Sequence, residues 1–256
     1  HPPMDLWDVD IRRMMRFQGN ARYLRDRTVE GLGLLYQMHW PFRQIVSARP
    51  ARTSPLHDRL AARGACFGET AGWERPNWFA PEGVEPSYVY SFGRQNWFEH
   101  SAAEHRAVRQ GVGVFDQSSF VKFLLQGRDA ERVLNRVSAG DVAVPCGKVV
   151  YTAWLNERGG FESDLTVTRI AEDAFLIVTS VTSQTRDFAW LKRNIPDDAR
   201  ATLTDVTSGT AVLGVMGPGS REFLAPLTGA DLSNDAFPFG TSQEIEIGYA
   251  LVREIG

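Results

Sequence analysis

The sequence contains no long hydrophobic run. Its longest weakly polar stretch, residues 31–42, is about a dozen residues long and includes Gln, His and Pro, whereas a membrane-spanning helix needs about 20 apolar residues. The start of the chain mixes Pro, acids, Trp and Arg and lacks the basic and then apolar regions of a secretory signal. We therefore expect no membrane association and a cytoplasmic location, or the mitochondrial matrix if the source is eukaryotic.

Cysteine and excess charge are both scarce. The two cysteines, Cys66 and Cys146, form no CxxC or Cys/His cluster, which favours two buried free thiols over a disulfide or a zinc site. Five histidines without a neighbouring Asp or Cys cluster give no metal site. Because 28 basic residues face 31 acidic ones, no basic excess is available for nucleic acid.

Common cofactor and catalytic fingerprints are also missing. A dinucleotide site needs three glycines spaced GxGxxG, and the segments 31–36, 111–116 and 217–222 each supply only two. No GxxxxGK[ST] phosphate loop and no GxSxG nucleophile motif occurs. The sequence therefore offers no site of its own for FAD, NAD or a nucleoside triphosphate of these types.

The composition is that of a globular protein, and the helical pattern of the first part of the chain ends near residue 50. The 256 residues, 43% hydrophobic and 23% charged, allow one large domain or two small ones. Residues 10–39 show helical periodicity, which puts Ile11, Met14, Met15, Tyr23, Leu24 and Leu34 on one face. The segment 47–55 then interrupts the helix, and Ser54-Pro55 predicts a short helix that runs to about residue 63. We predict a helical segment over 1–53 and a second domain over 54–256.

The second domain is predicted to be α+β with a mainly antiparallel sheet and flanking helices. Residues 72–83 are expected to be a loop held by buried aromatic side chains, and Ser101 with Glu104 predicts a capping box that begins a helix ending at Gly111. Six strands rich in Val, Ile, Thr and aromatics follow, with helices between some of them, over residues 121–127, 148–156, 161–170, 174–181, 210–217 and 243–254. Mixed elements with a direct hairpin argue against a regular βαβ winding.

The hairpin 148–170 brings two chemically useful side chains together. If residues 156–159 form its loop, Tyr151 lies opposite Asp164 and both side chains share one sheet face. A carboxylate beside an aromatic ring suits a planar, amine-bearing ligand. On the residues alone, the favoured interpretation is a solvated acid on an edge strand beside a half-buried tyrosine, and the ligand site is the alternative.

Five stretches in order resemble one known family. Residues 54–80, 91–127, 159–167, 214–224 and 231–239 are similar to the C-terminal folate-binding region of the sarcosine dehydrogenase and dimethylglycine dehydrogenase family of FAD-dependent oxidoreductases. That region is itself similar to the aminomethyltransferase (T-protein) of the glycine cleavage system. Residues 1 to about 50 resemble the central segment that follows the flavin domain. The resemblance implies an aminomethyltransferase-like folate-binding fold that accepts a one-carbon unit from an oxidised N-methyl amine onto tetrahydrofolate, giving 5,10-methylenetetrahydrofolate.

The resemblance also implies roles for particular residues. The folate-contacting aspartate of the family corresponds to Asp164, which we expect to be the catalytic residue, and the tyrosine before the turn corresponds to Tyr151. Phe120, Val178 and Ser180 match positions that line the cofactor pocket. The T-protein has Asp-Asp where this chain has Ser163-Asp164, so only the second carboxylate is retained.

The ends of the chain suggest a piece of a longer protein. It begins with His1 and stops at Gly256, just before the position of a family motif whose glutamate binds the pterin ring. We therefore expect this piece by itself to bind folate weakly and to be inactive. The FAD-binding oxidoreductase domain is expected upstream as its partner in the same parent chain, acting on a small N-methyl amine. The alternative is a non-catalytic relative that serves as a regulatory or interaction module, like the pyruvate dehydrogenase phosphatase regulatory subunit; retention of Asp164 and Tyr151 favours the enzyme.

Overall fold

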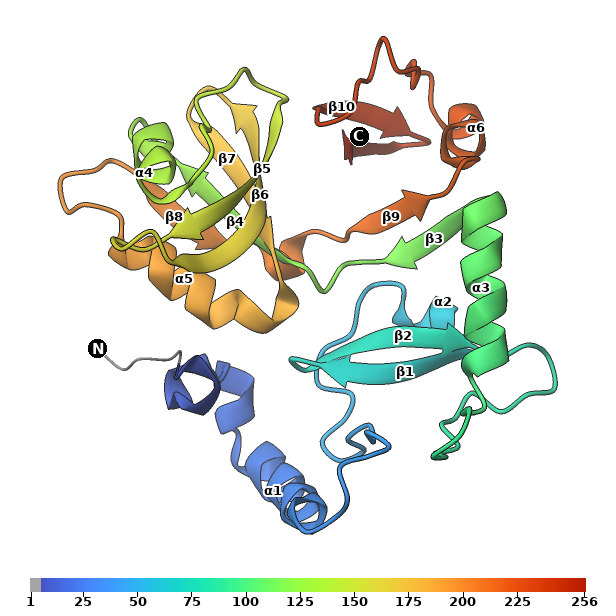
Figure 1. The fold of residues 1–256 in the computed structure, drawn as a ribbon. Helices are drawn as coiled ribbons and strands as arrows, with labels where there is room; N and C mark the ends of the chain where they lie inside the picture. Colours follow the sequence, from blue (N-terminus) through green and yellow to red (C-terminus); the bar gives the residue numbers. More distant parts are fainter. Residues whose placement is uncertain (1–5) are drawn as a thin grey trace. The chain divides into compact units, whose positions relative to one another are not determined.

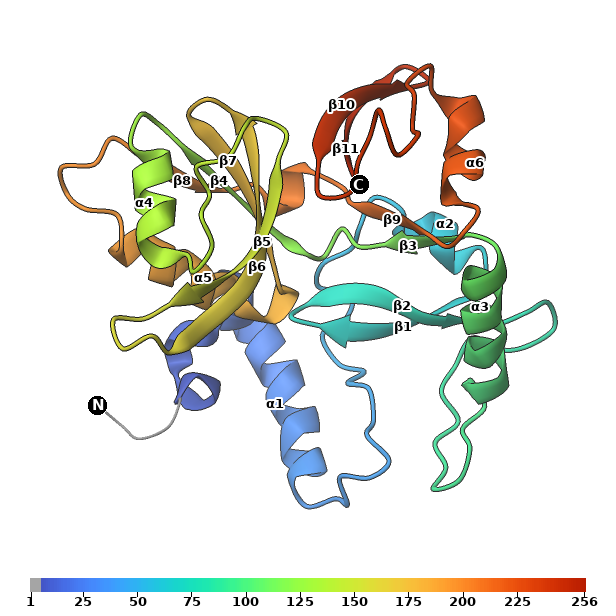
Figure 2. The same ribbon diagram turned by 45° about the horizontal axis from the view of Figure 1, so that its top comes forward.

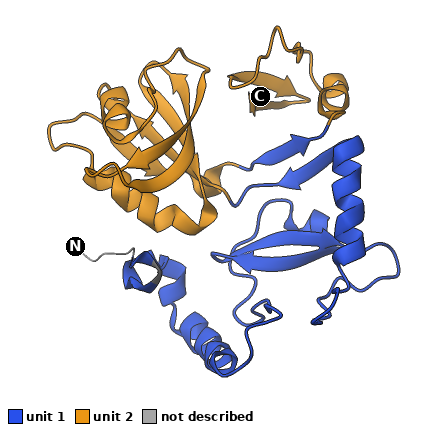
Figure 3. Ribbon diagram, in the orientation of Figure 1, with its two compact units in different colours: residues 1–119, 211–217 blue, residues 120–210, 218–256 orange. Residues whose placement is uncertain are grey.

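The chain divides into two compact units. The structure is a computed structural model that describes residues 6–256. Unit 1 comprises residues 1–119 and 211–217, and unit 2 comprises residues 120–210 and 218–256 (Figure 3). Named strands in the described part of the chain pair antiparallel throughout, which confirms the predicted α+β class with a mainly antiparallel sheet.

Unit 1 combines short helices with two small sheets (Figure 1). One sheet pairs β1 with β2, and the other pairs β3 with β9, which the chain reaches only after passing through unit 2. The elements of this unit are η1 (Trp7–Val9), η2 (Ile11–Arg13), η3 (Arg16–Gly19), α1 (Ala21–Leu35), α2 (His57–Ala61), β1 (Ala65–Thr70), β2 (Trp73–Phe79), α3 (Phe98–Gln110), β3 (Gly113–Asp116) and β9 (Leu213–Met216).

The N-terminal segment does not bury the apolar face that its periodicity predicts. Helix α1 has no buried residue, and Ile11 and Leu24 are 81% and 50% exposed. The predicted single helical stretch is instead three 3-10 turns followed by α1. The predicted boundary near residue 53 falls inside unit 1, where the amide of Arg52 donates to the carbonyl of Gly72 (2.8 Å) and Glu74 donates to the carbonyl of Arg52 (2.9 Å). We keep the boundary between residues 53 and 54 as a proposal that rests on the sequence.

Two local predictions in unit 1 are wrong. Residues 73–79 form strand β2, although the aromatic side chains of Trp73 and Trp78 are buried as expected. Pro76 is tolerated because β1 is the only described strand paired with β2 at this position, which leaves the other edge of β2 without a ladder there. Helix α3 begins at Phe98 rather than at a Ser101 cap, and the carboxylate of Glu104 accepts a hydrogen bond from the amide of Phe79 (2.7 Å).

Unit 2 is built on a five-stranded sheet with the order β5-β6-β7-β4-β8 (Figure 2). Its remaining elements are two helices beside this sheet and a C-terminal module. The bounds are β4 (Val121–Gln126), α4 (Ala130–Val137), β5 (Val149–Leu155), β6 (Phe161–Ala171), β7 (Ala174–Thr179), η4 (Val181–Ser183), α5 (Gln184–Arg193), β8 (Thr202–Asp205), η5 (Thr207–Gly209), α6 (Ser220–Leu224), η6 (Ala225–Leu227), β10 (Ser242–Ile247) and β11 (Ala250–Ile255).

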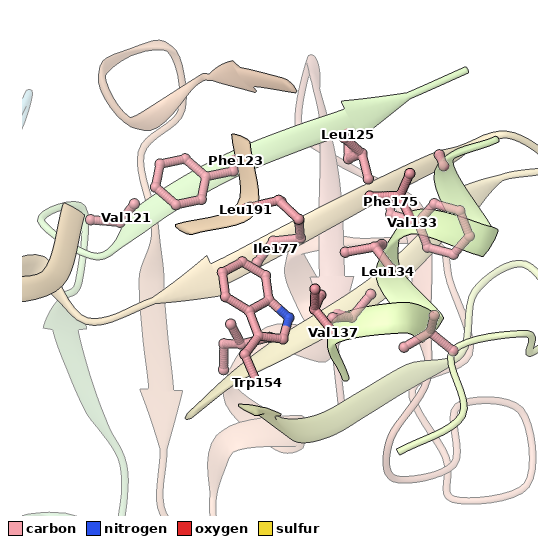
Figure 4. Close-up of a cluster of buried hydrophobic side chains, with 14 residues drawn as sticks. Val121, Phe123, Leu125, Val133, Leu134, Val137, Trp154, Phe175, Ile177 and Leu191 are labelled. Atoms are coloured by element: carbon pink, nitrogen blue, oxygen red, sulfur yellow. The ribbon is translucent and has the colours of Figure 1, made fainter. Parts of the chain in front are cut away.

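The hydrophobic core of unit 2 lies on one face of this sheet (Figure 4). Alternate residues of β4 and β6 point into it, as the two-residue period of a strand requires. Helix α4 adds a stripe with helical spacing, and Leu191 of α5 completes the cluster. Its fully or almost fully buried members include Val121, Phe123, Leu125, Val133, Leu134, Trp154, Leu165, Val167, Phe175, Ile177 and Leu191. The opposite face of the sheet, which we call the second face, carries the intervening residues.

The C-terminal pattern forms two strands, not the single strand predicted over 243–254. Ile247 pairs with Ala250, so Gly248 and Tyr249 make a two-residue turn, and Gly248 has a φ of +60°. Such turns favour glycine because they need positive φ. The residues just before β10 are joined to the start of β5, since the amide of Val149 donates to the carbonyl of Gly240 (3.0 Å).

Candidate functional site

The β5–β6 hairpin brings Tyr151 and Asp164 into direct contact. The Tyr151 hydroxyl donates to Asp164 Oδ2 at 2.7 Å. Tyr151 is 71% exposed and Asp164 is also exposed. The predicted pairing of these two residues is wrong in register but right in face: Tyr151 pairs with Thr166, and Ala153 pairs with Asp164. The two side chains are therefore diagonal neighbours.

The register error has two local causes. Each shifts the pairing by one residue, and together they leave every side chain on its predicted face. The amide of Asn156 donates to the carbonyl of Gly160 (2.8 Å), which leaves a three-residue loop with Gly159 at φ +73°. A β-bulge between Trp154 and Leu155 then adds a second one-residue shift. Because a shift of two residues keeps every side chain on its original face, Tyr151 and Asp164 still meet.

The other predicted site residues fall in two neighbouring rows on the second face. Tyr151, Thr166, Val178 and Lys122 pair in sequence across β5, β6, β7 and β4. The register of the same ladders, continued one residue past β7 and β4, puts Ser180 and Phe120 in the row of Asp164. Tyr151, Asp164 and Val178 thus lie on one face of one sheet, and Ser180 and Phe120 lie just beyond the ends of β7 and β4 in the same register.

Sequence reasoning missed Thr166 and Lys122, which complete the first row. Thr166 is half-buried between Tyr151 and Val178, and Lys122 is 1% exposed. Lys122 is the polar member of the apolar run VKFLL, so the alternation of that strand shows which face it occupies. Its place beside Val178 depends on strand order, which no local pattern gives.

The chemistry of this face is that of a carboxylate beside a phenol and an apolar strip. The hydrogen bond from Tyr151 and the negative charge of Asp164 raise the pKa of Tyr151 above its ordinary value. Val178 and Phe120 are half-buried apolar neighbours. A planar ligand that carries amine nitrogens can stack against such a strip while the carboxylate orients a nitrogen or stabilises positive charge on it.

Other features of the described residues lie elsewhere in the chain. Both cysteines are free; Cys66 is buried, but Cys146 is exposed, so the prediction of two buried thiols is wrong for Cys146. Burial raises the pKa of the Cys66 thiol. Within residues 6–256, no group of three or more His, Cys, Asp or Glu side chains is arranged to hold a metal ion, and no helix has the length and apolar character needed to cross a membrane.

A surface hollow of about 310 Å³ is present in unit 1, and none of the predicted site residues lines it. Its lining residues are Gln37, Met38, Trp40, Pro41, Arg43, Tyr90, Ser91 and Phe92.

Comparison with known proteins identifies two family segments and several relatives. Residues 56–255 match the GCVT N-terminal domain, and residues 1–54 match the FAD dependent oxidoreductase central domain. The chain is 46% identical over 97% of its length to a 4-methylaminobutanoate oxidase (formaldehyde-forming) from Paenarthrobacter nicotinovorans. It is 34% identical over 98% of its length to the mitochondrial pyruvate dehydrogenase phosphatase regulatory subunit of Mus musculus, and 32% identical over 99% of its length to mitochondrial sarcosine dehydrogenase of the same species.

These relatives are much longer than the chain, which covers 30%, 29% and 32% of them respectively. Among solved structures, the chain is similar to the glycine cleavage system aminomethyltransferase T from Bartonella henselae, with a TM-score of 0.61 and 26% identity over 77% of this chain and 48% of that one. This similarity agrees with the mixed helices and antiparallel sheets described above. The chain therefore belongs to the GCVT N-terminal domain family, with an FAD dependent oxidoreductase central domain segment at its N-terminal side.

Proposed function

We propose that this chain is the folate-binding portion of an FAD-dependent N-methyl amine oxidase or dehydrogenase, and that it transfers the one-carbon unit of the oxidised amine to tetrahydrofolate. The observation that carries the proposal is the exposed Tyr151–Asp164 pair, 2.7 Å apart, on the same sheet face as Val178. Family membership supports it, since the relatives include an N-methyl amine oxidase and sarcosine dehydrogenase.

The residues of the second face fit the chemistry of a reduced pterin. Tetrahydrofolate supplies amine nitrogens that can capture an electrophilic carbon, and the product of that transfer is 5,10-methylenetetrahydrofolate. Asp164 is exposed and can accept a hydrogen bond from a ligand N–H or stabilise a positive charge that develops at nitrogen. Tyr151 holds Asp164 Oδ2 in place through its hydroxyl. Phe120, Val178 and Ser180 would line the rest of the site.

We assign the oxidation of the N-methyl amine to a part of the parent protein that lies outside these residues. None of its glycine-containing segments has the GxGxxG spacing, so its residues offer no dinucleotide fingerprint for FAD. We propose that the flavin is held by an oxidoreductase domain of the same parent protein, as the central domain match at residues 1–54 suggests. Choice among N-methyl amines would then belong to that domain.

The test is Asp164→Asn in the complete encoded protein. The substitution is nearly isosteric and removes the charge, so folate-dependent methylene transfer should fall by about 10² to 10³. Amine oxidation followed with an artificial electron acceptor should be nearly unchanged, and free formaldehyde should accumulate. The matched control is Glu157→Gln, which removes one negative charge from the exposed hairpin loop and should leave methylene transfer at the original rate.

A second candidate function is a non-catalytic regulatory or interaction module. It is favoured by the 34% identity to the pyruvate dehydrogenase phosphatase regulatory subunit over nearly the whole chain. On this alternative the unsubstituted protein forms no 5,10-methylenetetrahydrofolate from any N-methyl amine. Transfer at the original rate by the Asp164→Asn protein would instead show that Asp164 is only a surface acid.

A further inference from the structure

A buried carboxylate lies on the core side of strand β6, which carries Asp164, and of strand β7, which ends just before Ser180. Asp187 of helix α5 is 1% exposed, and its Oδ2 accepts hydrogen bonds from three hydroxyl groups. The donors are Ser163 (2.8 Å), Thr179 (2.6 Å) and Ser183 (2.8 Å). One oxygen atom thus joins strand β6, strand β7 and the start of α5.

The donors are the immediate chain neighbours of the candidate site residues. Ser163 precedes Asp164 on β6, and Thr179 precedes Ser180 at the end of β7. Because successive strand residues point to opposite faces, Ser163 and Thr179 point toward Asp187 while Asp164 lies on the second face. Ser183 adds a further tie, since its hydroxyl lies 3.2 Å from the carbonyl of Ser180.

We propose that Asp187 is a positioning residue for the Tyr151–Asp164 pair. By fixing Ser163 and Thr179, it sets the backbone on which Asp164 and Ser180 are mounted, and so the distance between the Asp164 carboxylate and the Tyr151 hydroxyl. The part of this proposal that concerns a ligand rests on the proposed folate site; the part that concerns the Tyr151–Asp164 pair does not.

The chemistry of the cluster is that of an orienting group rather than of a reacting one. Asp187 is buried and does not face the exposed Tyr151–Asp164 pair, so it cannot touch a ligand there. Burial raises the pKa of Asp187, and the three hydroxyl hydrogen bonds only partly oppose that effect. A buried acid costs free energy unless its hydrogen bonds are made, and here they constrain the rotamers of three short side chains on adjacent elements.

The experiment observes Tyr151 directly, without ligand. Tyrosines in the complete encoded protein are labelled with ¹³C at Cζ, and the Tyr151 signal is assigned with Tyr151→Phe. Asp164→Asn gives the signal position of a phenol without its carboxylate partner. Asp187→Leu, Ser163→Ala and Thr179→Val should each move the Tyr151 signal toward that position, while Asp187→Asn, which keeps an acceptor oxygen, should restore most of the original position. The matched control is Leu191→Ala, which removes a fully buried α5 side chain from the core without touching the hydroxyl cluster.

The outcomes separate positioning from general destabilisation. An unmoved Tyr151 signal in folded Ser163→Ala and Thr179→Val proteins would overturn the proposal, even if Asp187→Leu does not fold. Equal movement in Leu191→Ala would also overturn it, because any core damage would then have the same effect. If the protein binds tetrahydrofolate, the same variants should weaken affinity about tenfold, as is typical for partners that orient a ligand-binding group, and should have no further effect in an Asp164→Asn background. If the unsubstituted protein binds no tetrahydrofolate, the proposed function fails, whereas the Tyr151 signal still decides the role of Asp187.

Discussion

The ion pair between Arg49 and Glu74 should be one of the largest single electrostatic contributions to the stability of unit 1. Arg49 donates through Nε (2.9 Å) and Nη2 to the carboxylate of Glu74, through Nη1 to the carbonyl of Ile45 (2.7 Å) and through Nη2 to that of Phe67 (3.2 Å). The side chains are only 16% and 5% exposed. Removing one partner of such a pair strands a buried charge, which costs about 3–5 kcal/mol.

The magnitude can be worked out with a double-mutant cycle. Arg49→Met loses the ion pair and two carbonyl hydrogen bonds, so we expect a loss of about 3–5 kcal/mol in the free energy of unfolding. Glu74→Met leaves Arg49 with its carbonyl partners, and the loss should be about 3 kcal/mol. The double variant has no stranded charge and loses mainly the two carbonyl bonds, at about 1 kcal/mol each. The coupling between the two positions, which is the sum of the two single losses minus the loss in the double variant, should therefore be about 4–6 kcal/mol.

The assay is urea unfolding combined with native-state hydrogen exchange at the amides of β1 and β2, which reports on this hairpin specifically. The exposed pair Arg94–Glu99 is the control: it has an N–O distance of 3.1 Å, but its side chains are 73% and 71% exposed. The same cycle there should give a coupling below about 0.5 kcal/mol. Additive losses at Arg49 and Glu74 would refute the reasoning, because they would mean that neither charge depends on the other.

Three further predictions concern pH, the core and backbone strain. Burial raises the pKa of Glu30, but hydrogen bonds from the amides of Val46 and Ser47 outweigh the effect of burial, so that the pKa of Glu30 is lowered overall. The stability that Glu30 contributes should therefore be present above its ordinary pKa and lost as the pH falls through the lowered pKa. Glu30→Gln should reduce this loss of stability in unfolding measured from pH 6 to pH 3. Trp154 is fully buried, and its indole N–H has no partner among the described residues. Trp154→Ala should therefore lower the free energy of unfolding, measured with urea, by about 3–5 kcal/mol, and Trp154→Phe should lower it much less. Equal losses in the two variants would contradict this. Gly127 has a φ of +129°, and an added Cβ would lie 2.3 Å from the carbonyl oxygen of Arg200, so Gly127→Ala should lower the melting temperature by several degrees, whereas Gly229→Ala, which meets nothing within 4 Å, should leave it unchanged.

Local patterns predicted the face of the candidate site but not its full membership. The alternation in β5 and β6 put Tyr151 and Asp164 on one face, and that survived a two-residue register error because the side-chain period is two. The positions of Thr166 and Lys122 beside them depend on the strand order β5-β6-β7-β4. Pairings of this kind join residues far apart in sequence, and no periodicity within a single strand specifies them.

The wrong local predictions share a different cause. Pro76 argued for a loop, but it lies in a strand of a two-stranded sheet, where a missing amide hydrogen costs no ladder bond on the free edge. The strand predicted over residues 243–254 includes Gly248, whose positive φ instead makes it part of the turn between β10 and β11. In each case the residue type was informative, but its meaning depended on which neighbour the strand pairs with.

The segments defined by sequence families and the units defined by packing do not share a boundary, and the Arg49–Glu74 pair shows why. Arg49 belongs to the central domain match and Glu74 to the GCVT match, yet both are in unit 1 and their charges are buried together. The guanidinium of Arg52 also lies 4.3 Å from the ring centroid of Trp73 across the same join. A family boundary marks where related sequences stop aligning, whereas a unit boundary marks where few contacts cross. Substitutions of Arg49 and Arg52 should therefore act on the β1–β2 hairpin of the GCVT segment, although both residues belong to the central domain match.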